Sequence, residues 1–198
     1  YTIGIFKIFM DKLIFGTAGI PLTTTNPTTI NGIKRVKAVG LGAMELEFVR
    51  SINISEKIAP IIKETAKKSG VILTAHAPYF INLNAIEKSK IIASKKRIID
   101  SANITRLCGG YSVTFHAGFY LKQNPTKVFK TIKSNILDIR KTMNEQGNNV
   151  WLRPETTGKI TQFSGLKELL KISQETEKIM PCIDFAHMHA RTNGKNNT

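Results

Sequence analysis

The stretch VILTAHA (71–77), a helical segment and YSVTFHA (111–117) form the strand–helix–strand unit that decides the fold. Both heptapeptides are largely apolar or β-branched and end in His-Ala. Between them, residues 85–107 carry apolar pairs on one side of a helix and basic residues on the other. A long helical crossover joins strands that run parallel, so this unit predicts a parallel sheet.

The same alternation extends in both directions along the chain. Further strands are predicted at KLIFG (12–16), AMELEFV (43–49), NVWLRPE (149–155) and MPCIDFA (180–186). Helices are predicted after an N-cap at Ser55, after the cap Asn124-Pro125, and near 164–178. This α/β pattern fits either an open doubly wound sheet or a closed (β/α)₈ barrel. The glycines of GTAG (16–19) lack the GxGxxG spacing of a dinucleotide site.

Composition indicates a single basic domain. The chain has 198 residues, 41% of them hydrophobic, and its 29 Lys and Arg against 14 Asp and Glu give a net charge of +15. Such a charge favours a polyanionic partner, with nucleic acid ahead of a membrane surface, although a solvated basic surface has the same composition. Cys108 and Cys182 are expected to be reduced, buried thiols of a cytoplasmic protein.

The N-terminal residues are apolar but predict no membrane span. Lys7, Asp11 and Lys12 interrupt the run, which is also too short to cross a bilayer. We treat residues 1–9 as an extension of uncertain status without a role in the fold. Residues 10–198 are expected to form one partial barrel domain.

Imidazole and carboxylate side chains collect where the predicted strands end. His76, His116 and Glu155 close three of these strands. Asp184 lies in the last predicted strand, and His187 follows it. Each residue alone has an ordinary structural explanation, but their joint occurrence at one face of a barrel is typical of a metal site. Nitrogen and oxygen ligands of this kind suit zinc, manganese or iron(II).

Three segments resemble the sequence motifs of the endonuclease IV family of apurinic/apyrimidinic endonucleases. They are HAPYFINL (76–83), PETTG (154–158) and CIDFAH (182–187). FGTAGIP (15–21) and AMELEFV (43–49) are similar to the archaeal-type branch, and the resemblance covers about residues 10–191. It implies a (β/α)₈ TIM barrel, of which about six of the eight strand–helix units lie in this chain.

The resemblance also implies a reaction and a ligand set. Members of that family hold three zinc ions and cut DNA on the 5′ side of an abasic site by attack of a metal hydroxide. His76 and His116 would bind the first zinc. Glu155, the catalytic carboxylate, would bridge the first and second. Asp184 would bind the second zinc and His187 the third.

The implied partner is double-stranded DNA that contains abasic sites. Tyr79 matches a tyrosine that the family places on a DNA-contacting loop, and a tyrosine beside a proline is equally suited to packing a loop. His189 receives no ligand role from the resemblance, so we expect it to support a metal ligand or to have a structural role. We further expect a monomer that does not associate with membranes.

The sequence departs from the family at its C-terminal end. The family takes further ligands from its seventh and eighth units, whereas residues 191–198 read as a polar tail. We therefore expect a fragment or a truncated product that holds fewer than three zinc ions.

Two other functions remain open. A sugar isomerase or epimerase of the xylose-isomerase-like barrels also places His, Glu and Asp around a metal, but has less need of a basic surface. A catalytically incomplete DNA-binding fragment would bind DNA without cleaving it.

Overall fold

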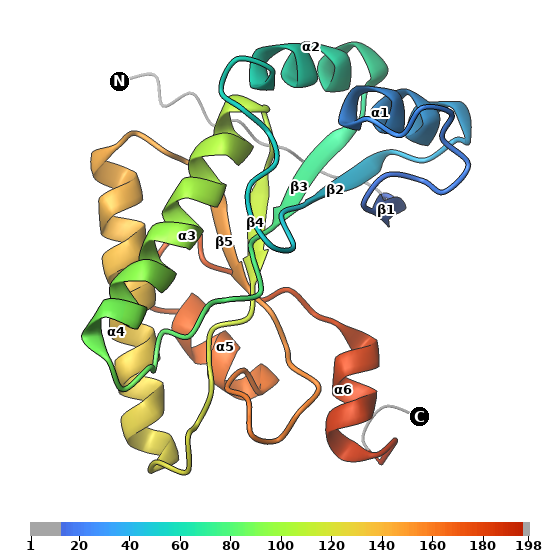
Figure 1. Ribbon diagram of the computed structural model, residues 1–198. Coiled ribbons are helices and arrows are strands. Elements are labelled where there is room, and N and C mark those ends of the chain that lie inside the picture. Colours follow the sequence, from blue (N-terminus) through green and yellow to red (C-terminus); the bar gives the residue numbers. More distant parts are fainter. Residues whose placement is uncertain (1–12, 196–198) are drawn as a thin grey trace.

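Five parallel strands form one sheet in the order of the chain. The computed structural model describes residues 13–195 (Figure 1). The strands, which pair β1-β2-β3-β4-β5, are β1 (Gly16–Ala18), β2 (Ala43–Glu47), β3 (Ile72–His76), β4 (Ser112–Phe115) and β5 (Trp151–Pro154). Every pairing between neighbours is parallel.

Six helices accompany the strands in the described residues. They are α1 (Thr29–Ala38), α2 (Ala59–Ser69), α3 (Lys88–Leu107), α4 (Pro125–Glu145), α5 (Leu166–Ser173) and α6 (Phe185–Thr192). Each of α1 to α4 packs against the next, and together they flank one side of the sheet (Figure 1). A doubly wound sheet reverses its strand order and carries helices on both faces. Sequential order with helices on one side therefore identifies consecutive units of a barrel.

Alternation along the strands explains which face the helices cover. In β2, Met44 and Leu46 are buried, whereas Glu45 and Glu47 between and beside them point to the opposite face and are only partly buried. The buried face joins aliphatic side chains of the helices in one continuous core. The face away from the helices carries the polar side chains, as the inner face of a barrel does when it supports a site at its mouth.

Local sequence signals account for several helix ends. The Asn124 side chain accepts hydrogen bonds from the backbone of Thr126 and Lys127, so the predicted cap of α4 is confirmed. Ser55 is not the cap predicted for α2, because residues 56–58 form a turn and the helix begins at Ala59.

No helix was predicted between the first two strands, yet α1 lies there. Thr28 caps it by accepting a hydrogen bond from the backbone of Asn31. Gly32 weakened the helical pattern, because glycine is unfavourable inside a helix. Close packing explains why glycine occupies this position, since a Cβ at Gly32 would lie 3.1 Å from the Ile20 side chain.

The predicted sixth strand, 180–186, is wrong as a strand. Within the segment, only Cys182 forms an isolated parallel bridge, with Glu155, and Ile179 just before it forms another with Leu152. Its end is helical, because α6 begins at Phe185. In the described part of the chain, the sheet therefore has five strands and an extended sixth segment beside β5.

Both cysteines are free thiols, of which Cys108 is buried and Cys182 is partly buried. No helix within residues 13–195 has the length and apolar composition needed to cross a membrane. Residues 1–9 lie outside the described part of the chain.

Candidate metal centre

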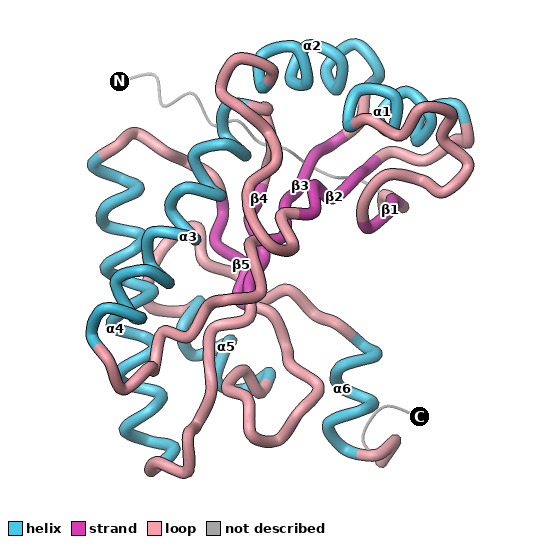
Figure 2. The backbone as a smooth tube through the Cα atoms, in the orientation of Figure 1, coloured by secondary structure: helices cyan, strands magenta, loops and turns pink. Residues whose placement is uncertain are grey.

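The carboxyl ends of β3, β4 and β5 bring three potential ligands to one edge of the sheet. His76 is the last residue of β3, and His116 and Glu155 directly follow β4 and β5. Parallel pairing keeps these strand ends in register. Figure 2 shows the same strands ending close together at the centre of the molecule, where loops leave toward α5 and α6.

These three side chains form the first ligand group. Oε2 of Glu155 lies 2.7 Å from Nε2 of His116 and 3.3 Å from Nε2 of His76. One ligand atom from each residue lies within 4.8 Å of the others. His76 and Glu155 are only 8% and 7% exposed, so the group is largely removed from water.

The backbone assigns the ring nitrogens of His76. Its Nδ1 lies 2.7 Å from the carbonyl oxygen of Ala77, a distance at which the ring N–H donates to that carbonyl. In the neutral ring, Nε2 then carries a lone pair and faces the carboxylate of Glu155. Two lone-pair atoms in contact are unfavourable unless a proton or a metal cation lies between them. Metal-binding histidines commonly show this arrangement, with the second nitrogen donating to a carbonyl.

The pKa values follow from burial and these contacts. Burial raises the pKa of Glu155, but hydrogen bonds and charges from His116 and His76 outweigh it and bring the value to about 2. Burial lowers the pKa of His76, but its hydrogen bonds to Glu155 and to the Ala77 carbonyl raise the pKa above its ordinary value. The group is thus an ionised carboxylate surrounded by imidazoles, which is a favourable environment for a divalent cation.

Asp184 and His187 form a second ligand group with Glu155. Nδ1 of His187 lies 3.3 Å from Oδ2 of Asp184 and 3.8 Å from Oε1 of Glu155. The same nitrogen also lies 2.9 Å from the carbonyl oxygen of Thr156. If Nδ1 donates its hydrogen to that carbonyl, Nε2 becomes the ligand atom of His187. Glu155 belongs to both groups, because each of its oxygens faces a different one.

Asp184 does not close a strand as expected, but caps α6. One carboxylate oxygen accepts a hydrogen bond from the backbone N–H of His187 at 2.7 Å. The other oxygen faces the ring of His187. The helix N-terminus therefore fixes the orientation of Asp184 and His187.

Thr156 is a residue of the site that the sequence analysis did not single out. Its hydroxyl accepts a hydrogen bond from the backbone N–H of Asp184 at 2.9 Å and lies 3.3 Å from the Asp184 carbonyl. Its own carbonyl faces His187. Its position directly after Glu155 in a Pro-Glu-Thr-Thr-Gly segment was the available signal.

Glu45 is a further carboxylate near the first ligand group that was not predicted from the sequence. Burial raises its pKa to about 7, partly offset by His76 and increased by Glu47 and Glu155. Thr74 on the neighbouring strand contacts it through a hydroxyl at 3.4 Å. The alternation of β2 could have indicated it, because apolar residues alternate with Glu45 and Glu47.

Arg191 belongs to the site region, although it was expected to begin a polar tail. Its Nη1 donates to the carbonyl oxygens of Lys159 and Gln162, at 2.7 and 3.0 Å, and contacts Thr157. These bonds tie α6 to the loop that follows β5. No pattern in the sequence indicated this contact.

Tyr79 and His189 complete the predicted set. Tyr79 is 54% exposed, and its ring lies with its centroid 5.4 Å from that of His76 and 6.2 Å from that of His116. His189 lies in α6 but in neither ligand group found among the described residues. The structure therefore places Tyr79 beside the first ligand group and leaves His189 outside both groups.

Comparison with known proteins agrees with the barrel. The sequence profile described as the xylose isomerase-like TIM barrel matches residues 33–197. The uncharacterized protein MJ0133 of Methanocaldococcus jannaschii is 43% identical over 182 residues, which are 92% of this chain and 64% of that protein. The chain thus spans less than two thirds of the length of this relative.

Solved structures of two kinds share the fold. Endonuclease IV from Thermus thermophilus superposes with a TM-score of 0.71 at 19% identity, over 90% of this chain and 65% of its own. A D-tagatose 3-epimerase-like protein also reaches 0.71, at 14% identity over 89% and 67%. L-ribulose 3-epimerase gives 0.70, at 12% identity over 90% and 62%.

At such identities these likenesses show the fold alone. They agree with a parallel sheet in sequential order that forms part of a barrel in this chain. Together with the profile match over residues 33–197, they show that the chain belongs to the xylose isomerase-like TIM barrel family.

Proposed function

We propose that the intact protein is a zinc-dependent endonuclease that hydrolyses the DNA phosphodiester bond on the 5′ side of abasic sites. The main observation that supports this proposal is that one carboxylate, Glu155, belongs to two ligand groups. A carboxylate shared in this way suits two neighbouring cations, which phosphoryl displacement uses to stabilise both the attacking and the leaving oxygen.

The donor set fits zinc. His76, His116 and Glu155 would hold one ion, and Glu155 with Asp184 a second, with His187 available to that ion or to a third. Zinc bound there would polarise the phosphate, lower the pKa of a water molecule and neutralise charge in the transition state. Imidazole nitrogens and carboxylate oxygens are its usual ligands outside cysteine sites.

Residues of the chain itself would orient these groups and the substrate. The carbonyl of Ala77 keeps Nε2 of His76 directed at the centre, and Thr156 fixes Asp184 and His187. Partial burial of the first group limits the water that competes with the substrate. The half-exposed ring of Tyr79 offers an apolar surface beside the centre, where an abasic nucleotide outside the base stack would lie.

The charge of the chain favours DNA over a neutral sugar. A net charge of +15 attracts a polyanion strongly. Such binding weakens as salt rises, because the release of condensed counterions then gains less free energy. A neutral ketose gains nothing from this charge.

The test is incision of a duplex that contains one abasic analogue. Purified protein should cut beside the lesion and leave a 3′ end that a polymerase extends. A chelator should abolish the cut, zinc should restore it, and the undamaged duplex should stay intact. Absence of a chelator-sensitive cut at the lesion would sink the proposal.

A sugar epimerase is the second candidate. It is supported by the same His, Glu and Asp ligand groups, which would also suit the divalent metal of a xylose-isomerase-like sugar epimerase. Conversion of a ketose in the presence of manganese, without binding to DNA, would favour it.

A further inference from the structure

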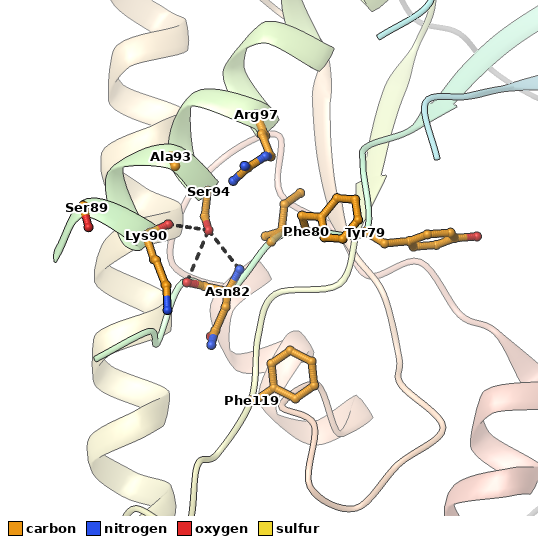
Figure 3. Close-up of a pocket in the computed structure, with 10 residues that line it drawn as sticks. Tyr79, Phe80, Asn82, Ser89, Lys90, Ala93, Ser94, Arg97 and Phe119 are labelled. Atoms are coloured by element: carbon orange, nitrogen blue, oxygen red, sulfur yellow. Dashed lines mark hydrogen bonds between the residues drawn. The ribbon is translucent and has the colours of Figure 1, made fainter. Parts of the chain in front are cut away.

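An open cavity of about 650 Å³ lies beside the metal centre, between α3 and the loop that follows β3. Ten residues line it, namely Tyr79, Phe80, Ile81, Asn82, Ser89, Lys90, Ala93, Ser94, Arg97 and Phe119 (Figure 3). Its volume falls within the range of roughly 300–1,000 Å³ that holds small ligands. None of the metal-ligand candidates lines it, so the cavity is separate from the ligand groups.

The loop forms a fixed wall of this cavity. The hydroxyl of Ser94 accepts a hydrogen bond from the backbone N–H of Asn82 at 3.0 Å and lies 2.7 Å from the carbonyl oxygen of Lys90. The Asn82 contact, drawn in Figure 3, attaches the loop to α3, whereas the Lys90 contact lies within that helix. The cavity is therefore largely formed before a ligand enters.

The chemistry of the lining is aromatic and cationic. Phe80 and Phe119 are 65% and 36% exposed, and both rings line the cavity. Arg97 projects from α3 and lines the cavity (Figure 3), and within residues 13–195 its guanidinium has no ion pair or hydrogen bond. Lys90 is paired with Glu87, and none of the ten lining residues is acidic.

Adjacent residues connect this cavity to the metal centre. Tyr79 lies against the rings of His76 and His116, while its neighbour Phe80 lines the cavity on the side of α3. Figure 3 shows the Tyr79 ring directed away from α3. A nucleic-acid strand that passes the metal centre would therefore reach the cavity by crossing a single loop.

We propose that this cavity binds one nucleotide of a nucleic-acid strand, with the base against Phe80 and Phe119 and a phosphate on Arg97. The proposal rests on the nuclease function proposed above and adds a subsite outside the metal centre. Base stacking on aromatic rings tolerates any sequence, and an unpaired guanidinium binds phosphate in a bidentate manner. An apolar peptide would leave the Arg97 charge unpaired, so the nucleotide is the better match.

The first test measures binding of a short labelled oligothymidylate and of its abasic counterpart with the same phosphates. Arg97→Ala should weaken binding of oligothymidylate at least about fivefold and reduce the salt slope by about 0.7, the value for one lost phosphate contact on a single strand. The matched control is Arg106→Ala, which removes the same charge from an exposed position on the same helix. Its effect should stay below about twofold.

A second variant separates the base contact from charge. Ala93→Phe fills the cavity without changing charge. It should weaken the binding of oligothymidylate at least about fivefold and leave the binding of the abasic probe unchanged. Equal effects of Arg97→Ala and Arg106→Ala, or equal affinity of the normal protein for both probes, would overturn the proposal. So would a concentration-dependent dimer that Ala93→Phe abolishes, since a second copy would then occupy the cavity.

These measurements need no incision. If the protein fails to cut abasic DNA but Arg97→Ala and Ala93→Phe still weaken oligothymidylate binding selectively, the subsite is supported and the nuclease function is not. If incision occurs and both variants bind both probes normally, the nuclease function is supported and the subsite is not.

Discussion

The two ligand groups share Glu155 but are held in place in different ways. His76 and His116 are fixed by the ends of paired strands, and the strands are anchored by a continuous apolar core. Asp184 and His187 belong to the start of α6, beside a segment that makes only isolated bridges to β5. The first group therefore depends on the sheet, and the second depends on a few local hydrogen bonds.

Exposure follows the same division. Apart from the shared Glu155, the His76 and His116 side chains of the first group are 11% and 21% exposed, whereas the Asp184 and His187 side chains of the second are 31% and 33% exposed. A buried group loses little entropy when it binds an ion, because packing already fixes its rotamers. If both groups hold zinc as proposed, the first group would bind its cation more tightly, and the second would respond more to changes around it.

The largest effect is expected from Glu155→Gln, because it removes the carboxylate that both groups share. An amide carries no charge, so cation binding should fall in both groups. Incision should drop by about 10³-fold, equivalent to roughly 4 kcal/mol of transition-state stabilisation. The measurements are bound zinc by elemental analysis and incision rate. Glu64→Gln, exposed on α2, is the control and should change neither. Full zinc content in Glu155→Gln would show that the groups are independent of this residue.

Thr156→Val tests the local hydrogen bonds of the second group alone. The substitution keeps the side-chain shape but removes the hydroxyl that holds the backbone of Asp184. We expect two zinc-binding steps, a tighter one at the first group and a weaker one at the second. The zinc affinity of the weaker step should fall by about 10–100-fold, the usual cost of losing an orienting hydrogen bond, whereas that of the tighter step should stay unchanged. Competition with a chromophoric chelator resolves the two steps.

The control for this variant is Thr105→Val. Thr105 is also fully buried, and its hydroxyl bonds only within α3. It should lower stability by a similar amount and leave both zinc affinities unchanged. If Thr156→Val weakens both steps equally, the two groups are not held separately and the comparison is wrong.

The difference between the groups also explains what could be predicted from the sequence. Strand ends are readable because apolar runs end at recognisable positions, so His76, His116 and Glu155 were correctly expected at one edge of the sheet. The sequential strand order could not be read in the same way, since the alternation of strands and helices fits two architectures. Parallel pairing of each strand with the next, with the helices on one side of the sheet, decided it.

The second group was harder because its geometry is set by contacts distant in sequence. MPCIDFA (180–186) is apolar enough for a strand, but pairing depends on partners that no local pattern reveals. Thr156 and Asp184 are 28 residues apart, and the bond between them has no periodic signature. Asp184 three residues before His187 could have been read as a helix cap, an alternative to a strand end.

The smallest effect concerns Glu45, which lies behind the first group on the inner face of β2. Its pKa in the folded chain, about 7, exceeds the value near 4.3 of an unfolded glutamate. The folded state therefore holds the proton more tightly, and its stability is highest below that lower value and declines as pH rises through 7. Glu45→Gln removes this charge, so the metal-free variant should lose less stability between pH 5 and 8, by roughly 2 kcal/mol after allowance for partial exposure.

Urea unfolding of the normal chain and of Glu45→Gln across this pH range measures the difference. Other titrating groups cancel to first order because both chains carry them. Glu56→Gln, an exposed control, should follow the normal chain. If the free energy of unfolding of Glu45→Gln and of the normal chain changes equally with pH, Glu45 is solvated on the inner face of β2. The low exposure of the first group would then be limited to His76 and Glu155 and would not extend to Glu45.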